Sequence, residues 1–360
     1  MKLKKIVALA LTSVMAISLL TACGGSASSS EAAPAESKEE SAVESVAESS
    51  AEETAESAEI DYSALKIGVM LSGSANDGGW SQMGADAAGA AAEKYGCEVN
   101  YTESIASTDY EAIMKGYADA GYNIIVSHGA EFLDTAKLIA PDYPDVFFIC
   151  TSAQSGQEPN VAGVDFATFQ LGFLNGVAAA MATEAGKIGA IGSNEIDSII
   201  AWVAGVEAGA KYINPDVEVL SVYTGSYDDQ LKAKQSVKAL EEQGVDVITQ
   251  NADACGIGAI QQCDEDGLIN VGAVSDQTVE GESCFLSVIQ DAKLGIEIAV
   301  EKAIAGELPA GANVMGADVG VISLSSYSGK YADKLTDEQK AQIEELWELS
   351  KTTDLATLVE

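Results

Sequence analysis

The sequence predicts an α/β protein in which two doubly wound lobes enclose a ligand cleft. From residue 65 onward short β-branched runs alternate with helical patterns, and the same rhythm begins again after residue 166. The strand runs are almost continuously apolar, which is typical of parallel strands buried on both faces. Strands that alternate with helices of this length indicate βαβ units, and the length of this region suits two domains.

The first half of this region contains five expected strands and three expected helices. The strands are expected at 65–71, 97–103, 123–129, 146–152 and 160–166, and the helices at 80–95, 109–120 and 131–140. Gly96, Gly121 and Pro144 lie at the ends of these elements, where glycine and proline commonly interrupt regular structure.

The second half repeats the pattern. Strands are expected at 187–193, 217–223, 245–251, 268–274 and 283–290, and helices at 168–183, 198–213, 229–243, 256–266, 291–305 and 336–349. The apolar run 314–324 is too short for a new domain, so we expect it to return to a lobe already formed. Ligands of doubly wound folds bind at the carboxyl ends of the strands, and the polar residues there are the candidates for a site.

The N-terminus predicts export and lipid attachment. Three lysines at positions 2, 4 and 5 precede an apolar stretch at 6–20, which is typical of a signal peptide and short for a membrane span. The following Leu-Thr-Ala-Cys resembles a bacterial lipobox. We therefore expect a signal peptide at 1–22 and a lipid on Cys23, which anchors the protein to the outside of the cell membrane. An ordinary secretory signal and an uncleaved membrane anchor are the alternatives.

Residues 23–60 are expected to form a disordered acidic tether. This tract is rich in Ala, Ser and Glu and has no aromatic side chain before residue 61. Such a composition buries too little apolar surface to offset the entropy of folding, and its like charges repel one another. A helical stalk is the alternative, because Ala and Glu favour helices, but the frequent serines and the missing apolar stripe weigh against it.

Composition excludes several classes of function. The formal net charge is -37, which disfavours binding to nucleic acid or to anionic lipid headgroups. The single histidine and the absence of paired CxxC motifs disfavour a metal site, and no catalytic motif of a hydrolase or P-loop enzyme is present. We expect no enzymatic activity, cofactor or metal. Five cysteines remain beside Cys23, and no disulfide is predicted among them.

Candidate ligand residues in the first lobe follow its first and third strands. Asn76, Asp77, Trp80, Ser81 and Gln82 lie in and after the loop that ends the first strand. Asn and Asp accept hydrogen bonds from a ligand or cap the next helix, and an indole offers a flat stacking face. The third strand ends in His128 and Gly129, followed by Phe132. His128 is either a partner for a polar ligand or a residue satisfied by neighbouring backbone.

The second lobe offers carboxylates at equivalent positions. Glu195, Asp253 and Asp276 follow three of its strands, and each suits a ligand hydroxyl or N–H group. Capping of a helix is the alternative role, and it is as strong for Asp253. Asp276 is the favoured candidate because Ser-Asp-Gln directly ends a buried strand. Phe166, Trp202 and Gln290 complete the candidate set.

Several ordered segments resemble the BMP (basic membrane protein) family of substrate-binding lipoproteins. They are SGSANDGGWSQMGADAAG, IIVSHGAEF, FQLGFLNGVAAAM, GVEAGAKYINPDVEV, VYTGSYDD, QGVDVITQNADACGIG and GAVSDQ, and the resemblance spans about 65–328. It implies a type I periplasmic-binding-protein fold, binding of purine nucleosides or related purines, and delivery to an ABC permease.

The resemblance also implies roles for individual residues. Trp80 would stack on a purine base, and His128 and Asp276 match polar positions of the family. Family members that bind nucleosides carry Phe and Asn where this chain has Trp80 and Ser81. They also carry a ribose-binding Lys where this chain has Gln290, which weakens the expectation of ribose recognition and strengthens that of a free base or another flat heterocycle.

We expect a monomeric solute-binding lipoprotein that captures a purine nucleoside or base by closure of its lobes. The expected N-terminal lobe is 61–165 plus 290–318, and the expected C-terminal lobe is 166–289 plus 319–360. A ribose-type sugar is the alternative ligand, and a ligand-sensing surface receptor is the alternative role. The chain contains no arginine, which disfavours phosphate-bearing ligands because bidentate arginine commonly binds them.

Overall fold

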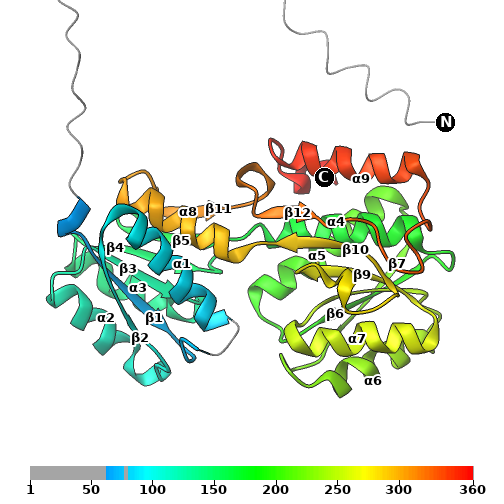
Figure 1. The fold of residues 1–360 in the computed structure, drawn as a ribbon, viewed down its shortest axis with the longest axis horizontal. Coiled ribbons are helices and arrows are strands. Elements are labelled where there is room, and N and C mark those ends of the chain that lie inside the picture. The colour runs from blue at the N-terminus through cyan, green and yellow to red at the C-terminus, as the bar shows by residue number, and fades with distance from the viewer. Residues whose placement is uncertain (1–61, 77–79, 360) are drawn as a thin grey trace, which may run out of the picture. The chain divides into compact units, whose positions relative to one another are not determined.

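The computed structural model describes residues 62–76 and 80–359 (Figure 1). The predicted signal peptide, the lipid site at Cys23, the tether and Asp77 lie outside these ranges. Glu59–Glu360 forms one compact unit. Within the described ranges, no helix has the length and apolar character needed to cross a bilayer.

The first sheet contains six strands in the order β11-β5-β4-β3-β1-β2, and each pair is parallel. Its strands are β1 (Lys66–Leu71), β2 (Glu98–Thr102), β3 (Ile124–His128), β4 (Phe147–Thr151), β5 (Val161–Asp165) and β11 (Gly311–Val314). Helices α1 (Trp80–Tyr95) and α8 (Ala292–Ile304) cover one face, and α2 (Tyr110–Asp119) and α3 (Leu133–Ile139) cover the other.

The second sheet repeats this arrangement in the order β12-β10-β9-β8-β6-β7. Its strands are β6 (Lys187–Gly192), β7 (Glu218–Tyr223), β8 (Val247–Asn251), β9 (Ile269–Val274), β10 (Cys284–Gln290) and β12 (Ile322–Leu324). Helices α4 (Thr168–Ala182) and α5 (Asp197–Ile213) lie on one face, and α6 (Gln230–Glu241) and α7 (Asp253–Asp266) lie on the other. The last helix is α9 (Asp337–Ser350). The two doubly wound sheets confirm the predicted α/β class.

The run 314–324 is divided between the two sheets. Its first residue, Val314, ends β11, which pairs in parallel with β5. Residues 322–324 form β12, which pairs antiparallel with β10 and caps the edge of the second sheet. The sequence did not predict this antiparallel edge, because three residues carry too little periodicity to reveal a strand direction.

Helices α4 and α5 pack backbone to backbone. A Cβ atom added at Gly209 of α5 would lie 1.9 Å from the carbonyl oxygen of Phe173 in α4, and one at Gly176 would lie 2.1 Å from the carbonyl oxygen of Val206. Only glycine permits this separation. Trp202 is fully buried in the same interface, and its Nε1 donates to Asn175 Oδ1 at 3.0 Å. Asn175 in turn donates to the Gly272 carbonyl at 2.8 Å, which ties α4 to β9.

Three segments connect the sheets, and hydrogen bonds join them. The Met315 N–H donates to the Asp165 carbonyl at 2.8 Å, and the Asp291 N–H donates to the Val321 carbonyl at 2.8 Å. Asp165 is buried at the end of β5, where its carboxylate accepts from Thr168 Oγ1 at 3.0 Å. Burial raises the pKa of the Asp165 carboxyl, and hydrogen bonds from Thr168 and Phe166 oppose the rise.

Replacement of Gly209 by alanine should destabilise the protein by about 1–3 kcal/mol, because the methyl group forces α4 and α5 apart. Gly89→Ala is the matched control: Gly89 lies in α1, and no atom falls within 4 Å of an added Cβ. The control should stabilise α1 by about 0.5–1 kcal/mol, since alanine loses less backbone entropy than glycine. Urea unfolding measures both changes, and equal effects at the two sites would contradict the close α4–α5 contact.

Asp165→Asn should alter how stability depends on pH. The raised pKa of Asp165 means that the folded state holds its proton to higher pH than the unfolded state does. This carboxyl therefore lowers the stability of the native protein as pH rises from the ordinary carboxyl pKa of about 4 through the raised value. Below about pH 4 the Asp165 carboxyl is protonated in both the folded and the unfolded state, so it does not make stability depend on pH.

The free energy of unfolding of Asp165→Asn, minus that of the native protein, should therefore increase between pH 3.5 and pH 7. Any change in hydrogen bonding shifts this difference by an amount independent of pH. Urea titrations across this range measure it, and a difference that stays constant would show that burial does not control this carboxyl.

Candidate functional site

His128 and Trp80 form a stacked pair at the carboxyl end of the first sheet. His128 ends β3 and lies opposite Leu71, the last residue of β1, so the strand end meets the loop that leads to α1. The His128 and Trp80 rings are 4.0 Å apart with an interplanar angle of 22°. This stack brings together two residues that lie 48 positions apart in the sequence.

Hydrogen bonds orient the imidazole of His128. Its Nε2 lies 2.8 Å from the Trp80 carbonyl oxygen, and its Nδ1 lies 2.9 Å from Thr151 Oγ1. A carbonyl oxygen only accepts, so Nε2 donates and Nδ1 accepts from the hydroxyl. The ring is fully buried, and a Cβ at Gly84 of α1 would lie 2.4 Å from it. Neighbouring protein groups thus bond to both ring nitrogens of His128, as in the alternative role given above. The buried ring also supports the indole of Trp80.

Trp80 itself is 38% exposed. His128 covers one face of the indole, and Phe166 approaches it edge-on at 6.4 Å. Phe166 is otherwise buried, and its carbonyl oxygen accepts from Gln290 Nε2 at 2.7 Å. Gln290 thus bonds to the segment that connects β5 to α4, and its amide nitrogen already has a hydrogen-bond acceptor within the protein.

The other predicted ligand residues of the first lobe differ in their exposure and in the part of the lobe where they lie. Ser81 is buried, and its Oγ accepts from the Gly73 N–H at 3.1 Å, whereas Asn76 is exposed and Gln82 is half-buried. Phe132 is fully buried and packs against Tyr110 with ring centroids 4.2 Å apart, in the core beneath α2 and α3. This core position separates Phe132 from the Trp80 pair.

Gly129 adopts a backbone conformation with φ of 142°. Residues with a side chain rarely adopt this conformation, so glycine allows the chain to turn directly after His128.

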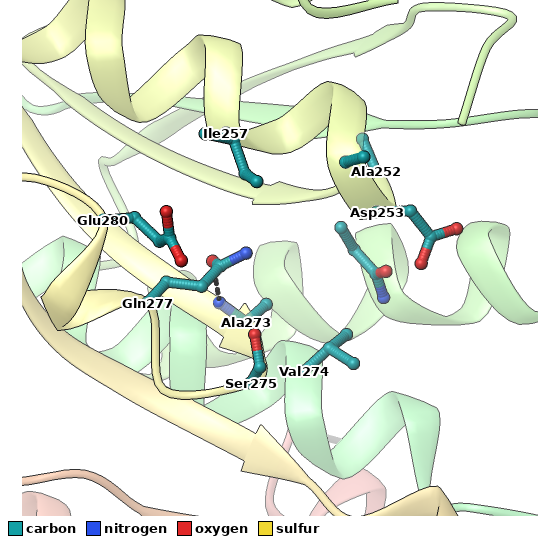
Figure 2. A pocket seen from close by; sticks show the side chains of 10 residues that line it. Ala252, Asp253, Ile257, Ala273, Val274, Ser275, Gln277 and Glu280 are labelled. Atoms are coloured by element: carbon teal, nitrogen blue, oxygen red, sulfur yellow. Dashed lines mark hydrogen bonds between the residues drawn. The ribbon is translucent and has the colours of Figure 1, made fainter. Parts of the chain in front are cut away.

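A pocket of about 280 Å³ lies at the carboxyl ends of β8 and β9 in the second sheet (Figure 2). Its lining combines amide, carboxylate and hydroxyl groups with short apolar side chains. The lining residues are Asn251, Ala252, Asp253, Ala254, Ile257, Ala273, Val274, Ser275, Gln277 and Glu280. A second hollow of about 490 Å³ adjoins the segments that connect the sheets, and none of the predicted ligand residues lines it.

Asp253 is the predicted ligand residue that lines the smaller pocket. It begins α7 with φ of 49°, an uncommon conformation for a residue with a side chain. The residue is exposed, yet desolvation by the surrounding protein atoms raises the pKa of its carboxyl.

Asp276 does not line the pocket, although it follows β9 as predicted. Its Oδ1 accepts from the Thr278 N–H at 3.1 Å and from Thr278 Oγ1 at 2.6 Å, which caps the short helix Gln277–Val279. The next residue, Gln277, directs its side chain into the pocket instead. Ser275 and Gln277 of the Ser-Asp-Gln motif line the pocket and Asp276 does not, a distinction that the motif by itself did not reveal.

Two further candidates lie apart from this pocket. Trp202 is part of the α4–α5 interface, where Asn175 holds its indole N–H, so we leave it out of the proposed site. Glu195 is exposed after β6, and its charge adds to burial in raising the pKa of Tyr223.

The cysteines of the described ranges are free thiols, and all but Cys97 are buried. Burial raises the pKa of the Cys150 thiol to about 12 and that of Cys284 to about 11, which keeps them protonated and poor nucleophiles.

No group of three His, Cys, Asp or Glu side chains in the described part of the chain is arranged to hold a metal ion. The geometry at the strand ends suits binding of a polar, flat molecule.

Comparison with known proteins identifies relatives along almost the whole described chain. Residues 64–354 match the family described as "ABC transporter substrate-binding protein PnrA-like". The chain is 30% identical to the transcriptional activator protein med of Bacillus subtilis (strain 168), over 73% of this chain and 82% of that protein. It is 27% identical to a purine-binding protein of Brucella abortus (strain 2308), over 78% of this chain and 81% of that protein.

The fold is also similar to solved structures. A transcriptional activator of the comK gene from Bacillus halodurans superposes with a TM-score of 0.66 at 23% identity, covering 80% of this chain and 98% of that one. The comparison confirms the type I periplasmic-binding-protein fold. The family match over 64–354 shows that this chain belongs to the Bmp family of PnrA-like ABC transporter substrate-binding proteins.

Proposed function

We propose that this substrate-binding protein captures a purine base or purine nucleoside outside the cytoplasm and delivers it to an ABC permease. The exposed face of Trp80 is the observation that carries the proposal. Buried His128 holds the opposite face and the backbone of Trp80, so the indole is fixed before a ligand arrives. Stacking of a base on a fixed aromatic side chain contributes about 1–3 kcal/mol. The purine-binding relative supports this choice of ligand.

Members of this family bind substrates and do not convert them. We propose lobes of 61–165 plus 290–318 and of 166–289 plus 319–360. The strands divide between the two sheets in the same way, except that Gln290 ends β10 of the second sheet. Closure of these lobes would bury a ligand between Trp80 and the pocket at β8 and β9. The ligand would favour the closed state through contacts that it makes only there.

Gln290 favours a free base over a nucleoside in this proposal. Its Nε2 donates to the Phe166 carbonyl oxygen, with Thr168 Oγ1 at 3.4 Å as a second neighbour. A neutral amide held in this way lacks the positive charge that would draw a ribose hydroxyl. We therefore expect free purines to bind at least as tightly as their nucleosides.

We further propose that the protein is a monomeric lipoprotein anchored through Cys23. The signal peptide, the lipobox and the acidic tract support this anchor. The net charge of -37 opposes adsorption to an anionic membrane, so the anchor would keep the protein beside its permease.

A thermal-shift screen of Glu59–Glu360 tests the ligand. A compound that binds only the folded state raises the melting temperature when its concentration exceeds its dissociation constant. Free purines should raise it, and nucleosides should raise it equally or less. Trp80→Leu should weaken purine binding by roughly 5- to 150-fold, which corresponds to the loss of one stacking contact.

Trp347→Leu is the matched control for this variant. Trp347 lies in α9 and donates to the Ile322 carbonyl at 2.9 Å, away from the stacked pair and the pocket. The control should lower the melting temperature without changing the dissociation constant in calorimetry. Stabilisation by pentoses and by no purine would replace this proposal with sugar binding.

Cys23→Ser should abolish lipid attachment. The native chain is expected to incorporate labelled palmitate and to sediment with membranes, whereas the variant should remain unlabelled. Cys97→Ser is the control, because Cys97 is a half-buried free thiol of the folded body and its loss should leave the label in place. Equal labelling of native protein and Cys23→Ser would exclude the predicted anchor.

A further inference from the structure

Gln277 presents an unused amide nitrogen to the pocket at β8 and β9. The residue is only 8% exposed, and its side chain lines the pocket. Figure 2 shows the nitrogen directed toward the middle of the labelled residues, while the carbonyl oxygen faces the Ala273 N–H. Among the described residues, this nitrogen has no hydrogen-bond partner.

A chain of buried amides sets this orientation. Gln277 Oε1 accepts from the Ala273 N–H at 3.0 Å and from Gln250 Nε2 at 2.7 Å. Gln250 Oε1 accepts in turn from Asn270 Nδ2 at 2.8 Å. A backbone N–H only donates, so the atom that faces Ala273 must be the oxygen of Gln277. The nitrogen consequently points away from the protein and into the pocket.

The backbone of Gln277 is also fixed, because its N–H donates to Ser287 Oγ at 3.0 Å. Gln250, Asn270 and Ser287 are all buried, so the arrangement cannot exchange its bonds with water. A donor held in this way needs an acceptor on the ligand, because a buried N–H that loses its partner is costly.

The remaining polar lining combines two carboxylates with the amide of Asn251 and the hydroxyl of Ser275, which can donate or accept. Asp253 and Glu280 contribute carboxylates, which accept hydrogen bonds from ligand N–H groups. A ligand that satisfies both kinds of group carries an acceptor oxygen beside an N–H donor. The lactam edge of a 6-oxopurine has this pattern, with O6 as the acceptor and N1–H as the donor. Adenine in the same orientation has the two roles exchanged, so its 6-amino donor would meet the Gln277 donor and its N1 acceptor would meet a carboxylate. A pocket of about 280 Å³ is slightly smaller than the usual small-molecule site of about 300–1,000 Å³, which suits a ligand as small as one base.

We propose that Gln277 selects 6-oxopurines over 6-aminopurines. This inference rests on the proposed binding of purines and specifies which purines bind. The native protein should bind hypoxanthine at least about tenfold more tightly than adenine, because a site that donates to a ligand oxygen discriminates strongly against a ligand that lacks it.

Gln277→Glu tests the role of the side chain by calorimetry with both bases at pH 8. The variant keeps an oxygen for Ala273 and Gln250 but presents a second oxygen, in place of the nitrogen, to the pocket. Hypoxanthine binding should weaken at least about tenfold, and adenine binding should hold or improve. Gln243→Glu is the control for the added charge, since Gln243 is exposed just after α6 and donates to the Ala239 carbonyl. It should leave both affinities unchanged.

A ligand comparison covers the case in which Gln277→Glu does not melt cooperatively. Native protein should bind hypoxanthine at least about tenfold more tightly than unsubstituted purine, which lacks the 6-oxygen. Adenine binding as tight as hypoxanthine, or an unchanged preference in folded Gln277→Glu, would overturn the role of Gln277 and leave purine binding intact. Binding of no purine at all would overturn the proposed function and this selectivity together.

Discussion

Hydrogen bonding between parallel strands makes all of them end at one edge of their sheet, so side chains from distant parts of the chain meet there. In the first sheet, the pairing of Leu71 with His128 brings the loop after β1 beside the end of β3. In the second sheet, the pairing of β8 with β9 places Asn251 and Gln277 around one pocket. Each half of the candidate site therefore depends on strand register.

Helix termini compete with the ligand for the carboxylates at these edges. The first N–H groups of a helix lack partners within the helix, and an acidic side chain beside them satisfies one. Asp276 does so for the short helix after β9, and Asp229 and Asp291 do so for α6 and α8. The indole of Trp80 and the amide of Gln277 do not cap a helix, and in our proposal both face the ligand.

Both proposed ligand contacts have the same construction, in which the protein satisfies one side of a group and leaves the other side for the ligand. The imidazole of His128 covers one face of Trp80, and buried amides bind the oxygen of Gln277 while its nitrogen stays unbonded. Groups held in this way lose little conformational entropy when a ligand binds. Their buried supports serve the site without touching the ligand.

The sequence by itself determined the α/β class, the repetition of the sheets, most helices and the family, because apolar periodicity and ordered motifs are local properties. It also located the strand ends at which the candidate site lies. It did not distinguish Asp276 from Gln277, and it grouped buried Phe132 and Trp202 with exposed Trp80. Those distinctions depend on which face of an element is buried and which helix end needs a cap. Only the packing of distant segments decides these matters, because burial and hydrogen-bond partners come from residues far away in the chain.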